Sequence, residues 1–201
     1  MTLTELELDA LTEIFNVGVG QAANSLSQLA GSTVLLNIPV VQLLSKTKVA
    51  QKLGEQGAGR ICAVRQGFSG VFNTEAVLMF PVHQSLQLVQ MMVGSDVPLE
   101  QLGEMEQEAL AEIGNILLNA VVSGVADMLK IEFTGSLPQV ELGPVADVLC
   151  PDGELEEVVL SLQIDFAIDA LEIKGYLVFL LDVASVEALG KKVTAFLESM
   201  V

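Results

Sequence analysis

The sequence is poor in the side chains that most enzymes use for chemistry. It holds one histidine, two cysteines and no tryptophan. Transition-metal sites need several nitrogen and sulfur ligands that converge, and this content does not provide the usual combinations. The thiols, Cys62 and Cys150, are far apart in the chain and are typical of ordinary cysteines in a reducing compartment. We therefore expect the chain to hold no metal and no cofactor of its own.

Positive charge is also scarce, with nine lysines and arginines against 26 aspartates and glutamates, a formal net charge of -17. Clustered bases are needed to bind phosphate backbones or anionic lipid surfaces, so nucleic acid and membrane are poor partners. The apolar runs are short and interrupted by polar residues, and the N-terminus lacks the basic stretch and apolar core of a secretory signal. These absences predict a cytoplasmic protein.

Familiar catalytic motifs are missing as well. The sequence contains no G-x-S-x-G nucleophile elbow and no Walker motif. The segment GVGQAA superficially resembles a phosphate loop, but it lies inside a helical pattern and no strand precedes it. We interpret Gly18 as a site of close helix packing and Gly20 as a shallow spot on the outer helix face.

What the sequence does contain is an internal repeat. The stretch 9–39 returns ninety-nine residues later as 108–138, and both copies read E-x2-N followed by a proline after 22 residues. The matched residues are Glu13 with Glu112, Asn16 with Asn115, and Pro39 with Pro138.

Helical geometry gives this repeat a meaning. On a helix with about 100° per residue, the apolar residues of each copy form one buried stripe. The Glu and the Asn, three residues apart, lie side by side on the opposite, solvent-facing side in both copies. Four further residues extend these faces and are expected to contact a partner: Asp9, Gly20, Glu108 and Asn119.

Two mid-helix asparagines at matched positions are unexpected from propensity, because the Asn side chain competes for backbone hydrogen bonds. An Asn cannot take a proton at neutral pH, but its oxygen and amide can orient a water for attack. A plain solvated face, or a gene duplication that has diverged slowly, is the alternative interpretation and stays open.

The rest of the chain predicts an ordered α/β (α+β) fold, since 51% of residues are hydrophobic and 17% charged. Each half has a helix–three strands–helix pattern, and neither half has enough strands for a comfortable core of its own. We expect one domain, 1–201, made of two repeats at about 1–95 and 99–201. The repeats would be related by a pseudo-two-fold axis, and a six-stranded sheet would pack against the motif helices.

The expected elements of the first half are a helix at 4–30, a strand at 33–45, a loop at 46–58, a hairpin of 60–68 and 70–80 joined through Ser69–Gly70, and a helix at 82–93. Those of the second half are a helix at 104–130, a strand at 131–145, a loop at 143–153, a hairpin of 157–166 and 170–181, and a helix at 183–198. Pro39 is expected to mark an edge or a bulge of its strand.

The doubled pattern acid-x3-E-x2-N-x22-P resembles that of the CheC/CheX/FliY family of bacterial chemotaxis phosphatases, and two copies in a chain of this length are similar to its CheC-type members. The resemblance covers nearly the whole chain, with its specificity in 9–39 and 108–138. It implies hydrolysis of the aspartyl phosphate of the chemotaxis response regulator CheY.

The resemblance also assigns roles to the repeated residues. Glu13 and Glu112 would bind a lysine in the active site of the regulator. Asn16 and Asn115 would orient the attacking water, while the Mg²⁺ would belong to the regulator. Members of the family also associate with the receptor deamidase CheD, which is a further candidate partner.

Two positions depart from the family pattern. The first position is usually Asp or Ser, which Asp9 satisfies and Glu108 does not. Glycine often precedes the Asn, as Gly114 does, but Phe15 stands there in the first copy. The helical wheel places Phe15 toward the core, so it need not block the site. It can leave the two copies unequal.

Two other functions stay open at this point. The same faces could dock a response regulator or CheD without hydrolysis, as a binding module. The duplication could also be purely structural, as in a component of the flagellar switch, with the outward Glu and Asn as ordinary surface.

Overall fold

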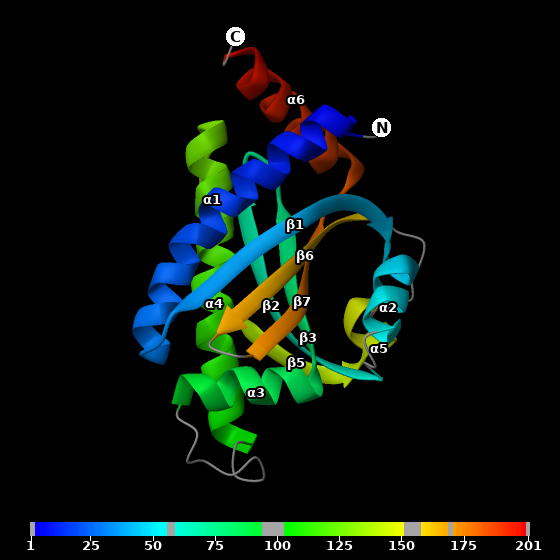
Figure 1. The fold of residues 1–201 in the computed structure, drawn as a ribbon. Coiled ribbons are helices and arrows are strands. Elements are labelled where there is room, and N and C mark those ends of the chain that lie inside the picture. Colours follow the sequence, from blue (N-terminus) through cyan, green and yellow to red (C-terminus); the bar gives the residue numbers. More distant parts are fainter. Residues whose placement is uncertain (1–2, 56–58, 94–102, 151–157, 169–170, 200–201) are drawn as a thin grey trace.

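The computed structural model describes residues 3–55, 59–93, 103–150, 158–168 and 171–199. The expected joint between the two repeats, at 95–98, lies outside the described residues. In these ranges an antiparallel sheet has helices on both of its faces (Figure 1). This is the α+β architecture that the sequence predicts.

The strands are β1 Val34–Ser45, β2 Arg60–Gly70, β3 Thr74–Pro81, β4 Phe133–Gly135, β5 Gln139–Pro144, β6 Val158–Ile168 and β7 Leu171–Leu180. Their order in the sheet is β1-β6-β7-β3-β2-β4, and β5 also pairs with β2. The hairpin β2–β3 lies beside the hairpin β6–β7, with β3 and β7 paired at the centre. The outer strand of each half pairs with the hairpin of the other half, because β1 joins β6 while β4 and β5 join β2. The two halves therefore build one shared sheet.

The helices are α1 Glu5–Ala30, α2 Lys46–Glu55, α3 Val82–Val93, α4 Gly103–Leu129, α5 Val145–Leu149 and α6 Val183–Glu198. In both halves the order is a long helix, an outer strand or pair of strands, a shorter helix, a hairpin and a closing helix. The start of α1 is fixed by a capping box, in which Thr4 and Glu7 satisfy each other's backbone amides. The helix ends at Gly31, whose φ of 67° suits glycine.

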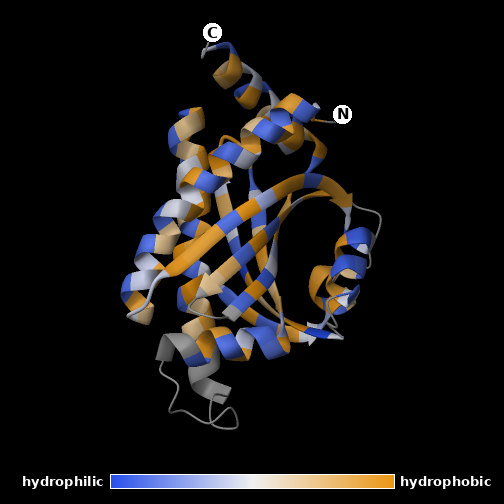
Figure 2. Cartoon of the chain, in the orientation of Figure 1, coloured by the Kyte–Doolittle hydropathy of each residue, from blue (hydrophilic) through white to orange (hydrophobic). Residues whose placement is uncertain are grey.

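The core lies in two layers, one on each face of the sheet. The larger layer packs α1 and α4, with α3 and α6, against the sheet. The smaller layer lies under α2 and α5, which sit side by side away from α1 and α4 (Figure 1). Figure 2 shows β1 as mainly hydrophobic along its length, as expected for a strand covered by α1. Each large apolar side chain buried in this way contributes roughly 1.5–3 kcal/mol.

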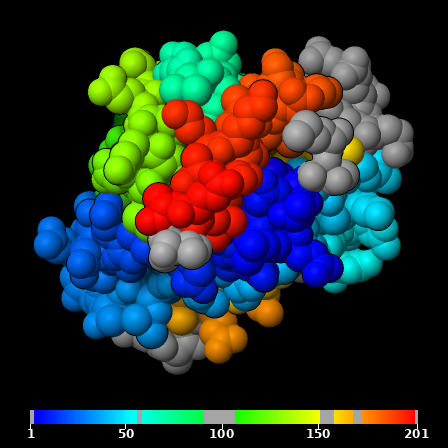
Figure 3. All heavy atoms as spheres, turned by 90° about the horizontal axis from the view of Figure 1, so that it is seen from above, coloured from blue at the N-terminus to red at the C-terminus, as the bar shows by residue number. Residues whose placement is uncertain are grey.

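Two glycines set the distance between the long helices. A Cβ added at Gly18 in α1 would lie 2.7 Å from the carbonyl oxygen of Ala120 in α4. A Cβ added at Gly124 would lie 2.8 Å from the Cα of Gly18. The two backbones thus touch where the helices meet, which confirms the expected close packing at Gly18. Seen from above, α6 lies across the ends of both helices (Figure 3).

The helix α4 contains a stretch, Gln107–Leu129, that is long and apolar enough to cross a membrane by length and composition alone. Half of its most apolar window is buried inside the molecule. The short, interrupted apolar runs of the sequence understate how apolar this helix is as a whole. Its apolar residues pack against α1 and the sheet, as those of a core helix do.

The expected loop at 46–58 is wrong, because residues 46–55 form α2. Val49 and Leu53, four residues apart, are fully buried in the smaller core layer. Lysine is a good helix former, so a lysine-rich stretch with this apolar spacing favours a helix once the sheet offers a surface to cover. The glycine at 54 marks its end, and residues 56–58 lie outside the described ranges.

Three further boundaries differ from expectation. The single strand expected at 131–145 is split into β4 and β5 around Pro138, so the sheet has seven strands in the described ranges instead of six. The expected loop after it contains the short helix α5. The β2–β3 turn lies at 71–73 and not at Ser69–Gly70, because β2 extends to pair Ser69 and Gly70 with β4.

Candidate functional site

The repeated acids lie on the outer faces of α1 and α4, as the sequence predicts. Asp9 and Glu13 are exposed on α1, and Glu108 and Glu112 are exposed on α4. Within the described ranges neither Glu13 nor Glu112 makes an ion pair or a hydrogen bond. Both carboxylates are therefore available to a cation from another molecule. Gly20 is also exposed, with nothing within 4 Å of the position of a Cβ.

The asparagine of the first copy is not a free surface residue. Asn16 is half-buried, and its carboxamide faces β1. Its Oδ1 accepts a hydrogen bond from the amide of Ile38 at 2.9 Å, while its Nδ2 donates to the carbonyl of Ile38 at 3.0 Å. Nδ2 also donates to the carbonyl of Thr12 at 2.9 Å, so both of its hydrogens are engaged. The sequence placed this side chain on the solvent side, and the structure turns its carboxamide to the strand.

Pro39 explains why β1 needs this side chain. A proline has no amide hydrogen, and here the register between β1 and β6 shifts by one residue between Asn37 and Val40. The extra residue leaves the backbone of Ile38 without a partner on β6, at a position where Ile38 itself is only 1% exposed. Asn16 satisfies that backbone. The spacing N-x22-P therefore has a structural meaning in the first copy.

The asparagine of the second copy is arranged differently. Asn115 is half-buried on α4, and Asn119, one turn later, donates from its Nδ2 to both the backbone carbonyl and the Oδ1 of Asn115, each at 2.7 Å. Among the described residues nothing accepts a hydrogen bond from the Nδ2 of Asn115. Asn119 thus fixes the orientation of this carboxamide and leaves its amide hydrogens available.

The second copy has a bulge at the same place, but it satisfies the bulge from the sheet. Residues 136–138 stand opposite two residues of β2, between the pairs Phe68 with Gly135 and Arg65 with Gln139. The side chain of Gln66 donates to the carbonyl of Ser136 at 2.8 Å, and Ser136 exchanges two hydrogen bonds with Gly67. Because β2 supplies these partners, the helix need not. Asn115 is left free of the strand.

Known proteins and solved structures were compared with this chain to find its relatives. No protein-family model matches the sequence. The CheY-P phosphatase CheC of Bacillus subtilis is 28% identical over 143 residues, which are 70% of this chain and 68% of CheC. The flagellar motor switch phosphatase FliY of the same organism is 27% identical over 175 residues, which are 84% of this chain and 45% of FliY. Among solved structures, FliY of Thermotoga maritima superposes with a TM-score of 0.79 at 22% identity, over 98% of this chain and all of that one.

The sequence and the fold of this chain are similar to those of the CheC/CheX/FliY family. Its fold is also shared by the middle domain of FliM from H. pylori, with a TM-score of 0.68 at 12% identity over 94% of this chain and 99% of that one. The match to CheC spans about two thirds of that protein, and the match to FliY less than half.

The position before each asparagine shows how this chain fits its two copies to one sheet. Phe15 is 2% exposed and stacks on Phe179 at 5.6 Å between ring centroids, so it faces the core as the helical wheel predicts. In the second copy Gly114 occupies this position, and a Cβ there would collide with the side chain of Val64. The departure at Phe15 therefore reflects packing against β7 and leaves the outer face of α1 unobstructed.

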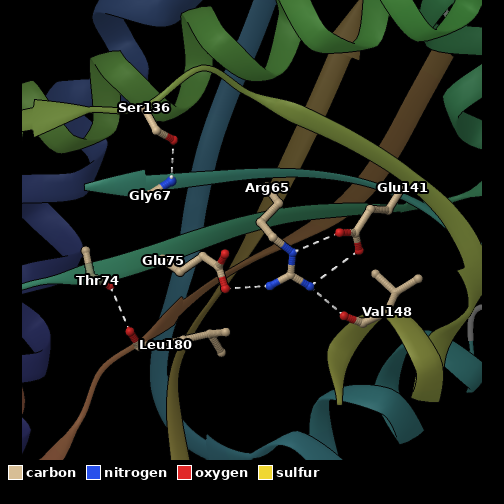
Figure 4. A network of polar contacts seen from close by, with 8 residues as sticks. All are labelled: Arg65, Gly67, Thr74, Glu75, Ser136, Glu141, Val148 and Leu180. Carbon is tan, nitrogen blue, oxygen red and sulfur yellow. Dashed lines mark hydrogen bonds and ion pairs between the residues drawn. The ribbon is translucent and has the colours of Figure 1, made fainter. Parts of the chain in front are cut away.

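The other polar cluster of the molecule lies on the opposite face of the sheet. Arg65 is paired with Glu75 at 2.6 Å and with Glu141 at 3.3 Å, and it donates to the carbonyl of Val148 at 2.6 Å (Figure 4). Val148 belongs to the smaller core layer under α2 and α5, so this network ties α5 to the sheet. It does not contribute to the faces of α1 and α4.

Metal ligands do not gather in the described part of the chain, where no group of three or more His, Cys, Asp and Glu side chains is found. The expected Mg²⁺ on a partner is not tested by this finding and stays a prediction. A small apolar cavity of about 30 Å³ lies beside Phe15 and Phe179, and its lining contains none of the eight predicted residues.

The sequence indicated the candidate site residues, but it did not indicate the residues that hold their side chains or replace their contacts. The backbone of Ile38, which binds Asn16, and the side chain of Gln66, which replaces that contact in the second copy, were not predicted. A signal for the first was present, since a proline inside a strand leaves backbone groups that some side chain must satisfy. Gln66 carries no such signal, because its role follows from the pairing of β2 with β5.

Proposed function

We propose that this protein hydrolyses the aspartyl phosphate of a CheY-type response regulator, with Asn115 orienting the attacking water and Glu112 binding a lysine of the regulator. The observation that carries this is the carboxamide of Asn115, fixed by Asn119 and unpartnered at its amide nitrogen, one helical turn from an unpaired exposed carboxylate. The names of two relatives, CheY-P phosphatase CheC and flagellar motor switch phosphatase FliY, support the substrate.

The chemistry asks little of the chain beyond position. Phosphoryl transfer is catalysed mainly by placing the nucleophile in line and by stabilising charge on the phosphoryl oxygens. A carboxamide can hold a water through its oxygen and its amide hydrogens, and holding a nucleophile in place lowers a barrier by several kcal/mol. We propose that Mg²⁺ arrives bound to the regulator and is not held by this chain.

The first copy offers the same residue types in a different state. Glu13 is exposed and unpaired, so it can bind a lysine as Glu112 does. Asn16 would have to release the backbone of Ile38 before it could hold a water, and this would leave two buried backbone groups unsatisfied. We therefore propose that the first copy docks the regulator and hydrolyses it more slowly than the second.

The test is the decay of a phosphorylated CheY-type regulator in the presence of the wild-type chain and of Asn16→Ala, Asn115→Ala and the double variant. We expect acceleration by the wild type, a large loss with Asn115→Ala, a smaller loss with Asn16→Ala once the folded fraction is taken into account, and none left in the double variant. If the double variant accelerates decay as much as the wild type does, the proposal is refuted.

A binding module is the second candidate function. FliM of H. pylori, which has the same fold, has been solved in complexes with FliG and with SpeE. The engaged carboxamide of Asn16 favours docking over hydrolysis in the first copy. In that case the wild-type chain would bind the phosphorylated regulator and leave its lifetime unaltered. Binding to a CheD-type deamidase is a further partner that we propose only from the family resemblance, and a pull-down with purified CheD tests it.

A further inference from the structure

Leu137 stands out among the exposed apolar side chains. It is 86% exposed, the highest value among the large apolar residues of the described ranges. Its counterpart in the first copy is Ile38, which is 1% exposed and part of the core. Single exposed leucines are common on protein surfaces, so exposure alone decides nothing. The position of Leu137 and the rigidity of its segment are what indicate a contact with a partner.

The segment that carries Leu137 is held firmly against β2. The amide of Ser136 donates to the carbonyl of Gly67 at 2.8 Å, and the amide of Gly67 donates to the hydroxyl of Ser136 at 3.0 Å (Figure 4). Gln66, only 2% exposed, donates to the carbonyl of Ser136 from the other side. The backbone on such a support is already ordered, so burying Leu137 against a partner costs little backbone conformational entropy.

The same segment runs beside the candidate site. At one end, the Cα of Gly135 lies so close to α4 that an added Cβ would be 3.3 Å from the Oδ1 of Asn119. At the other end, Val140 pairs with Val64, whose side chain fills the space at Gly114. Residues 135–140 therefore follow α4 between positions 114 and 119. Leu137 lies between those ends, on the part of the segment that follows this stretch of α4.

We propose that Leu137 is the apolar anchor through which the second copy docks the phosphorylated response regulator, a partner that presents an apolar surface beside the lysine bound by Glu112. The proposal rests on the proposed function and adds a residue that sets affinity. Interfaces draw most of their energy from a few apolar or aromatic anchors near polar contacts. An exposed leucine on a firmly held segment that follows the helix of an unpaired carboxylate suits that arrangement. The first copy cannot offer the same anchor, because Ile38 is buried.

The experiment compares Leu137→Ser with a control, Leu35→Ser, at an exposed apolar residue of β1 in the first half that is 63% exposed. Steady-state hydrolysis of the phosphorylated regulator gives KM and kcat for each variant, and unfolding curves show that both stay folded. We expect Leu137→Ser to raise KM roughly five- to thirty-fold with kcat changed less than two-fold. Leu137→Met should restore KM, and Leu35→Ser should leave KM within two-fold of the wild type.

A KM for Leu137→Ser within two-fold of the wild type, or an equal rise in both variants, would overturn the anchor while leaving the phosphatase proposal intact. If the wild-type chain does not hasten decay, the phosphatase proposal fails on its own. The anchor is then judged by titrating the chain against fluorescently labelled regulator, phosphorylated with a small-molecule phosphodonor. Weaker binding by Leu137→Ser alone supports it. Equal binding, or no binding by the wild type, removes it.

Discussion

Replacing Asn16 with alanine removes the side chain that satisfies a buried bulge, and the structure gives the size of the effect. The backbone amide and carbonyl of Ile38 would lose their partners at a position that is 1% exposed. Each unsatisfied buried group costs about 1–3 kcal/mol, and the better helix propensity of alanine returns only about 0.5 kcal/mol. The free energy of unfolding should therefore fall by about 2–5 kcal/mol. For a chain of this size that is a drop in Tm of roughly 4–20 °C.

The assay is urea or thermal unfolding followed by far-UV circular dichroism, since the chain has no tryptophan for fluorescence. The matched control is Asn115→Ala, whose carboxamide hydrogen-bonds, among the described residues, with the side chain of Asn119 and should change the free energy of unfolding by less than about 1 kcal/mol. If Asn16→Ala unfolds within about 0.5 kcal/mol of the wild type, Asn16 does not support the bulge. The proposed difference between the two copies, in which Asn16 supports a strand and Asn115 does not, would then be refuted.

Two further predictions concern the helices. Gly18→Ala should lower the free energy of unfolding by roughly 1–3 kcal/mol because its Cβ meets the backbone of α4, whereas Gly20→Ala, in open space, should raise it by roughly 0.5–1 kcal/mol. Equal stability of the two variants would contradict a tight helix crossing. Hydrogen bonding from the backbone of Thr4 holds the pKa of Glu7 below its usual value of 4.5. The stability contributed by this carboxylate is thus present above that value and lost as pH falls through the lowered pKa, and unfolding curves of Glu7→Gln should lack that part of the acid dependence. If the free energy of unfolding of Glu7→Gln depends on acid pH as strongly as that of the wild type, this prediction is refuted.

The long elements of the fold could be read from the sequence because their signals are local. The helical period of its apolar stripe predicted a helix at 4–30, close to the observed α1 at Glu5–Ala30. The helix α2 was missed because its stability comes from burial of Val49 and Leu53 against the sheet, which no local pattern shows. The split between β4 and β5 follows from pairing with β2, a long-range contact that single-sequence reasoning does not supply.

The candidate site shows the same division. The repeat located Glu13 and Glu112 on exposed faces, because helical period and charge are sufficient for that. The different hydrogen bonding of Asn16 and Asn115 could not be predicted, since it depends on whether a helix or a neighbouring strand satisfies the backbone at each proline bulge. In the first copy the helix does so through Asn16, and in the second the neighbouring strand does so through Gln66. Identical motifs thus acquire different roles from their surroundings.

The most direct test of the central claim is the single-turnover rate of phosphate release from a phosphorylated CheY-type regulator saturated with the Asn115→Ala chain. If the carboxamide of Asn115 positions the water, this rate should fall by about 100-fold, to the slower rate supplied by the first copy, while the affinity for the regulator is retained. A rate equal to that of the wild type, measured with the same regulator, would contradict the account.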